Sequence, residues 1–160
     1  MAIPQVQEVL KIISMGRSRF LYGLDRVPDD RLNWSPGGVA STPLQLAGKT
    51  AVFLGFVSHV LQTRTPPNVD APRPEPPNSR EEANAVVEAA FTHLRKVVSE
   101  FTETDLRQTA PAPWGEASIG TLLFWISGLI LYHQGQLNYL QLAYGDEDPN
   151  IPPNWGREEG

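Results

Sequence analysis

The first quarter of the chain carries apolar residues at helical spacing. They follow one another at separations of three, four or seven positions: Val6, Leu10, Ile13, Phe20 and Leu24. Such residues line one face of an α-helix, the face that a core would bury. The pattern predicts a helix over about 4–24, with Pro4 in a first turn that tolerates a missing amide hydrogen.

Capping motifs mark the beginnings of two further helices. Thr42 is followed three residues later by Gln45, and Ser79 is followed at the same distance by a glutamate. This spacing lets the two side chains satisfy free backbone donors at a helix start. The motifs predict helices over about 42–62 and 79–101.

The most apolar stretch lies between Leu122 and Leu142 and predicts a fourth helix over about 118–143. No segment alternates apolar and polar residues between turn signals, so we expect no sheet. Four long helices without strands predict an all-α fold, a four-helix bundle. The length suits a single domain over 1–160, with an extended tail over 146–160.

The second and third helices are joined by the segment TRTPPNVDAPRPEPPN, residues 63–78. Its composition is also that of a linker between two domains, but a pair of helices on either side could not fold alone. When extended, the segment reaches about 50 Å, whereas each neighbouring helix of about 20 residues is about 30 Å long. The segment therefore predicts a crossover that makes the third helix parallel to the second, in an up-down-down-up bundle.

The overall charge narrows the classes of partner. The chain has 160 residues and a formal net charge of -5, which argues against nucleic acid and anionic membranes as partners. It has no cysteine, which excludes disulfides and thiolate metal sites. It begins without a secretory signal and has no apolar run of about 20 residues, so we expect a cytoplasmic protein.

Gly48-Lys49-Thr50 has the letters that end a nucleotide-binding phosphate loop. Such a loop needs a glycine five residues before its last glycine, and Pro43 stands there without an amide hydrogen. The preceding WSPGG is no strand, and the lysine lies about two turns inside a helix. A nucleotide site is therefore rejected. Lys49 either extends its ammonium to water from the bundle edge or points into a polar pocket.

Three histidines fall one on each of the last three helices: His59, His93 and His133. Their helical faces disfavour a shared metal site, because only His133 lies squarely on an apolar stripe. No glutamate stands three residues before any of them, so the di-iron bundle motif is absent. Gly135, within LYHQGQLNYL, predicts a close approach of a neighbouring helix.

The segment YHQGQLNYLQLAYGDEDPN resembles the last helix of the DinB/YfiT-like superfamily, and VPDDRLNWSPGGVASTPLQLAGKTAVF is similar to its loop and second helix. The resemblance implies a four-helix bundle, often dimeric. Many members bind a divalent metal through three histidines, one on the second helix and two on the last. Characterised relatives include thiol-dependent transferases, an isomerase and proposed metal-dependent hydrolases.

The resemblance assigns the three ligand positions to Lys49, Leu129 and His133, and only His133 can bind a metal. It therefore implies a degenerate metal site and no bound cofactor. The positive charge of Lys49 would stand in place of the ion, near His133. The expected pocket is lined by Lys49, Phe53, Leu129, His133, Gln136 and Trp34.

Three functions remain open. The first is a binding module that takes a small anionic ligand or a partner through the former metal pocket. The second is a hydrolase or thiol-dependent transferase with zinc, nickel or manganese, held by His133 and carboxylates such as Asp25, Asp29 and Asp30. The third is a metal-free acid-base enzyme that uses Lys49 and His133. A homodimer is expected from the resemblance.

Overall fold

The computed structural model describes residues 3–153 and 155. Its elements in chain order are α1 (Pro4–Arg26), η1 (Asp29–Arg31), α2 (Pro43–Thr63), α3 (Arg80–Ser99), α4 (Glu103–Arg107), β1 (Thr109–Ala112), β2 (Gly115–Ser118) and α5 (Ile119–Ala143). The four long helices form the bundle, and the short elements lie at its ends.

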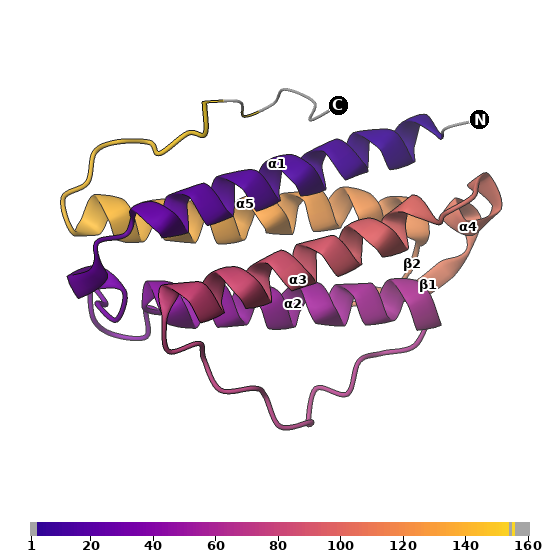
Figure 1. Cartoon of the computed structure of the whole chain (residues 1–160). Coiled ribbons are helices and arrows are strands. Elements are labelled where there is room, and N and C mark those ends of the chain that lie inside the picture. The colour runs from indigo at the N-terminus through magenta and orange to yellow at the C-terminus, as the bar shows by residue number, and fades with distance from the viewer. Residues whose placement is uncertain (1–2, 154, 156–160) are drawn as a thin grey trace.

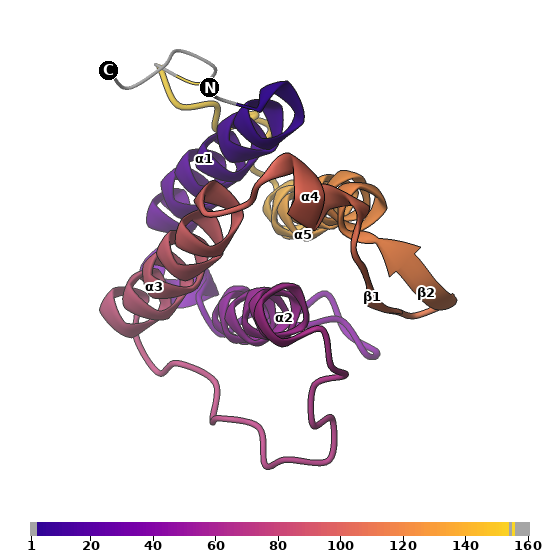
Figure 2. The same ribbon diagram turned by 90° about the vertical axis from the view of Figure 1, so that its right-hand side faces the viewer.

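The bundle has the up-down-down-up topology that the long crossover predicts (Figure 1). The crossover, residues 64–79, returns along the outside of α2, so that α2 and α3 run parallel. Seen end on, the order around the bundle is α1, α3, α2, α5 (Figure 2). The all-α fold and this order of helices are confirmed, and they place α2 beside α5.

The capping residues hold the helix starts as their spacing indicates. The Thr42 side chain accepts from the Gln45 amide at 3.2 Å, and the Gln45 side chain accepts from the Thr42 amide at 3.0 Å. The predicted third helix is shorter than expected, because α3 ends at Ser99 and α4 begins separately at Glu103.

The expectation of no sheet needs a correction. Strands β1 and β2 form an antiparallel hairpin in which Thr109 pairs with Ser118 and Ala112 pairs with Gly115. Each strand has four residues, too few for alternation to be recognised. Gly115 adopts a φ of 124°, a conformation that a glycine reaches without steric cost.

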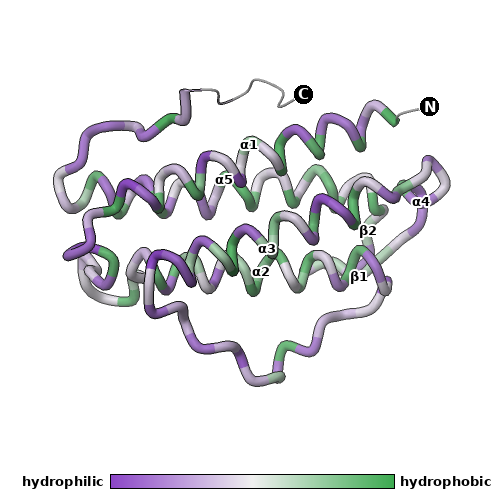
Figure 3. Tube along the Cα trace, viewed as in Figure 1, coloured by the Kyte–Doolittle hydropathy of each residue, from purple (hydrophilic) through white to green (hydrophobic). Residues whose placement is uncertain are grey.

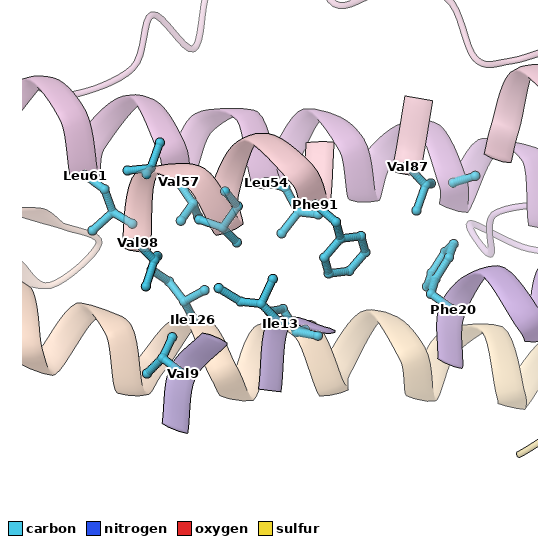
Figure 4. Close-up of a cluster of buried hydrophobic side chains, with 14 of the residues drawn as sticks. Val9, Ile13, Phe20, Leu54, Val57, Leu61, Val87, Phe91, Val98 and Ile126 are labelled. Atoms are coloured by element: carbon cyan, nitrogen blue, oxygen red, sulfur yellow. The ribbon is translucent and has the colours of Figure 1, made fainter. Parts of the chain in front are cut away.

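Buried side chains from all four long helices meet along the bundle axis (Figure 4). Ile13 of α1, Leu54 of α2, Phe91 of α3 and Ile126 of α5 each expose 1% of their surface or less. Hydrophobic residues dominate α2 and α5, while the crossover and tail are mostly polar (Figure 3). Within the described part of the chain, α2 alone is long and apolar enough to cross a membrane, and a bundle's core helix shares that property.

Two glycines set how closely α1 approaches α5. A Cβ on Gly16 would lie 2.2 Å from the Ile130 Cγ2 atom, and one on Gly23 would lie 3.2 Å from the Leu137 Cδ2 atom. Both glycines are buried. The side chains of α5 therefore occupy the space that larger residues on α1 would fill, and this fixes which face of α5 points inward.

The tail runs back along α1 as far as it is described. The Arg19 Nη2 atom donates to the Pro149 carbonyl at 2.8 Å, and the Trp155 indole donates to the Met15 carbonyl at 3.0 Å. The Arg19 guanidinium lies 5.1 Å from the Trp155 ring centroid, and burial lowers its pKa. The remaining residues of the predicted tail, 154 and 156–160, lie outside the described residues.

We expect Gly16→Ala to destabilise the bundle by about 1–3 kcal/mol, because the new methyl group would displace the branched side chain of Ile130. Gly55→Ala is the matched control, since a Cβ there meets no atom within 4 Å and alanine favours the helix by up to about 1 kcal/mol. Urea unfolding of the two variants measures the difference. Equal stability of both would contradict the close approach.

Candidate functional site

The structure gives each residue of Gly48-Lys49-Thr50 a separate role. Gly48 lies against the crossover, where a Cβ would stand 3.0 Å from the Pro77 ring. Lys49 is exposed, and its ammonium donates to the Ser41 hydroxyl at 2.7 Å. Thr50 is buried and its hydroxyl donates to the Leu46 carbonyl at 2.8 Å. Of the two readings of Lys49, the structure has the one in which the ammonium extends toward water.

Thr50 joins α2 to His133 on α5. Its Oγ1 atom lies 3.2 Å from the His133 Nδ1 atom. A threonine hydroxyl has one hydrogen, and the Leu46 carbonyl receives it, so the Nδ1 atom of His133 must donate. This bonding assigns the neutral tautomer with its hydrogen on Nδ1. The Nε2 atom of His133 is then an acceptor, and it has no hydrogen bond to any residue that the structure describes.

Burial lowers the pKa of His133 below its ordinary value of 6.5. Removing an imidazole from water disfavours its charged form. The ring is therefore neutral at pH 7, with a lone pair on Nε2. A neutral imidazole can accept a hydrogen bond from a ligand, take a proton, or bind a metal ion.

Aromatic rings form a continuous series on both sides of His133. The Phe53 ring lies 5.2 Å from the imidazole between centroids, and Tyr132 lies 5.6 Å from it. Phe53 also contacts Trp125 at 6.3 Å, and Trp125 contacts Trp114 of the hairpin at 5.3 Å. Trp114 remains 55% exposed, so the series ends at a surface that a planar molecule could contact.

The two helices that carry this site hold one charge between them. Neither α2 nor α5 contains an aspartate, glutamate or arginine, and Lys49 is their only lysine. Among the described residues Lys49 forms no ion pair, and an unpaired positive charge attracts anions. The α1–α3 seam differs, because there Arg17 pairs with Glu88 at 2.8 Å.

The pocket predicted from the resemblance is assembled only partly. Phe53 contacts His133, and Leu129 and Gln136 are half-buried on α5. Trp34 instead contacts Tyr144 at 6.0 Å, and Tyr144 lies eleven residues, about 16 Å, further along α5 than His133. Leu129 and Gln136 lie one turn before and one turn after His133, so these three residues and Phe53 share one side of the helix pair, here called the α2–α5 face, while Trp34 lies apart from it. Whether they act as a site stays a prediction.

Thr50 and Trp125 were missed by the sequence reasoning. A threonine within an apolar helix is usually interpreted as a core residue. Only its position on the side of α2 that faces His133 could have indicated the hydrogen bond. Trp125 stands near the start of the most apolar helix, where an aromatic residue is expected to be buried.

The other candidate ligands lie elsewhere. His59 and His93 are exposed, and the His59 ring bonds to Thr65. Asp29 pairs with Arg80 at 2.6 Å, and Asp25 accepts from the Asn84 amide. Asp25 thus joins α1 to α3, and Asp29 joins η1 to the start of α3.

The residues present do not fit the three-ligand metal site that the resemblance implies. Lys49 is held by Ser41 as an ammonium donor, and Leu129 has no donor atom. No group of three or more histidine, aspartate or glutamate residues that could hold a metal ion occurs in the described residues. A tight divalent site normally takes at least three protein ligands, so no chemical step is assigned to a metal here.

A shallow hollow lies at the opposite end of α5, between the starts of α1 and α5 and the helix α4. Gln5, Leu106 and Thr121 are among the residues that line it. It is about 20 Å along the helix axis from His133. The hollow is therefore separate from the face described above.

The protein is thus an all-α four-helix bundle, and its candidate site lies between α2 and α5. The family model described as DinB superfamily matches residues 12–137. The chain therefore belongs to the DinB superfamily.

The crystal structure of a DinB-like protein, YjoA from Bacillus subtilis, matches this fold with a TM-score of 0.73. The match covers 91% of this chain and 96% of that chain, at 12% sequence identity. Identity at this level shows the shared fold alone. No curated protein matches the chain.

We expect the His133 ring to titrate below pH 6.5 in an NMR titration in which His133→Gln identifies its signal. Because the unfolded chain takes up this proton at higher pH, wild-type stability should fall as the pH drops through about 6.5 toward the lower folded-state value. His133→Gln should lack this part of the loss, as urea unfolding at several pH values would show. A midpoint at or above 6.5 would contradict the burial of this ring.

Proposed function

We propose that this DinB-superfamily protein is a binding module for a small anionic ligand with an apolar or aromatic body, taken up by the α2–α5 face. The observation that carries the proposal is the exposed Lys49 ammonium, which bonds only to a neutral hydroxyl among the described residues and lies one helical turn from Phe53 of the aromatic series. A cytoplasmic location belongs to the same proposal.

The aromatic series supports the apolar half of the ligand. Phe53 and Trp125 are half-buried, and Trp114 is the most exposed of these rings apart from Tyr132. Planar or apolar molecules gain from contact with such rings while part of each ring stays in water. The hairpin holds Trp114 beside Trp125, so β1 and β2 form one border of this face.

Lys49 supports the anionic half. Its ammonium is exposed near the first turn of α2 and bonds only to a neutral hydroxyl among the described residues. A carboxylate or phosphate could replace Ser41 as the acceptor or bind beside it. Leu129 and Gln136 complete the border on α5. Both side chains are uncharged, and they can contact the ligand through an apolar group and an amide.

The ligand experiment compares aryl carboxylates and aryl phosphates with neutral amides of the same shape, by NMR on the full chain. We expect benzoate to shift the Trp125 indole and the Thr50 amide, and benzamide to bind more weakly. Lys49→Met should remove this preference, roughly threefold for an exposed charge pair. Lys96→Met, which removes an exposed lysine of α3, is the matched control. Equal binding by the anions and the amides would contradict the proposal.

Metal content tests the alternative, a metal-dependent hydrolase or thiol-dependent transferase. Purified protein offered zinc, nickel and manganese and then dialysed should retain far less than one equivalent, because His133 lacks two further ligands. Mass spectrometry of the metal gives the ratio. One tightly bound equivalent that is lost in His133→Ala would overturn the binding-module proposal and favour the enzyme.

A further inference from the structure

The outward face of α5 has no covering element among the described residues. Large hydrophobic side chains there expose between 58% and 80% of their surface: Phe124, Leu131, Tyr132, Tyr139 and Leu142. Residues 124, 131, 139 and 142 are separated by seven, eight and three positions, so they form one stripe along the helix. Contiguous exposed apolar surface of this kind marks interaction sites.

Two glycines lie in the same stripe. A Cβ on Gly128 or on Gly135 would meet no atom within 4 Å. The prediction that Gly135 admits a neighbouring helix is therefore wrong for the helices of this chain. A glycine inside a helix costs about 1 kcal/mol against alanine. Here the two glycines leave room for the backbone of a helix from outside the chain.

The stripe is symmetric about the point between Leu131 and Tyr132. Phe124 stands seven residues before Leu131, and Tyr139 stands seven after Tyr132. Gly128 and Gly135 stand three residues before and after the same pair. Two antiparallel copies of α5 related by a two-fold axis through this point would place aromatic against aromatic and glycine against glycine. A two-fold interface requires such self-complementarity.

The charges favour a second copy at this face. No aspartate, glutamate, lysine or arginine occurs in α5, so two copies can meet there without repulsion. Each copy carries a net charge of -5, which disfavours contact through the acidic parts of the surface. A neutral stripe also offers nothing that a charged partner would select.

The exposed area approaches that of a stable dimer. Phe124 and Tyr139 of the stripe and the neighbouring Tyr132 together expose about 400 Å² per copy, if each ring has about 150–250 Å² in all. Leu131, Leu142 and the glycine backbone add to this, so a pair buries on the order of 1,000 Å², the lower limit for a specific interface.

We propose that α5 is a self-association surface, on which a second copy of this chain packs antiparallel with its two-fold axis between Leu131 and Tyr132. The resemblance to the family implied a homodimer but did not say which surface forms its interface. The α5 stripe indicates both the interface and the register of the two helices. The proposal does not depend on the ligand proposal. Tyr132 connects the two regions, because its ring contacts His133 and its outer side would be covered by the second copy.

Sedimentation velocity of the full chain tests the surface. Wild-type protein should have twice the 17.7 kDa mass of one chain. Gly135→Met should be monomeric, since the new side chain fills the space that the second helix needs. Gly55→Met is the matched control, because its site is equally open within the chain, and it should remain dimeric. A monomeric wild type or a dimeric Gly135→Met would overturn the proposal.

Disulfide trapping tests the register in a chain without cysteine. Leu131→Cys lies beside the proposed two-fold axis and should give a covalent dimer under mild oxidation. Leu142→Cys on the same stripe should not, because it would face Thr121 of the other copy. Trapping by both variants would indicate parallel helices, and trapping by neither would indicate another interface. Either result would overturn the antiparallel register.

Discussion

The close approach of α1 to α5 is the constraint on which the arrangement of the last helix depends. Gly16 and Gly23 admit the side chains of Ile130 and Leu137, and a helix held at these points cannot rotate about its axis. The rotation of α5 then decides which residues face α2 and which face away. His133 reaches Thr50 on one side, while Gly128 and Gly135 are left on the outside.

The α2–α5 face shows how a single hydroxyl can fix the orientation of a half-buried imidazole. One hydroxyl links the helix backbone at Leu46 to the ring of His133, so the tautomer follows from a single threonine. The neighbouring lysine is directed to Ser41 and contributes charge without entering the core. Position and charge are thus supplied by adjacent residues on one helix, with the aromatic rings providing the rest of the surface.

The helices and their order could be predicted because their signals are local. The capping box at Thr42 determines where α2 begins. The proline-rich crossover determines the direction of α3, and each of these signals lies within one short segment. The hairpin at 109–118 was missed because its two strands have four residues each, one of them with a proline, and carry no recognisable alternation. The bond from Thr50 to His133 joins residues 83 positions apart, and the direction of Lys49 depends on Ser41. Neither is visible in spacing along one helix. Gly135 was expected to admit a neighbouring helix, but a Cβ there meets no atom within 4 Å, because the spacing of residues along α5 does not say which side of the helix points outward.

The crossover has a consequence for the integrity of the chain. It is exposed along nearly its whole length, with Pro77 buried near its end. A single cut near Val69, which is 60% exposed, would divide the protein into one fragment with α1 and α2 and another with α3 to α5. Each fragment buries its apolar faces mainly against the other, since α3 packs on both α1 and α2 and α5 packs on both as well. The two pieces would therefore be expected to reassemble from separate polypeptides, which makes this bundle a natural candidate for fragment complementation.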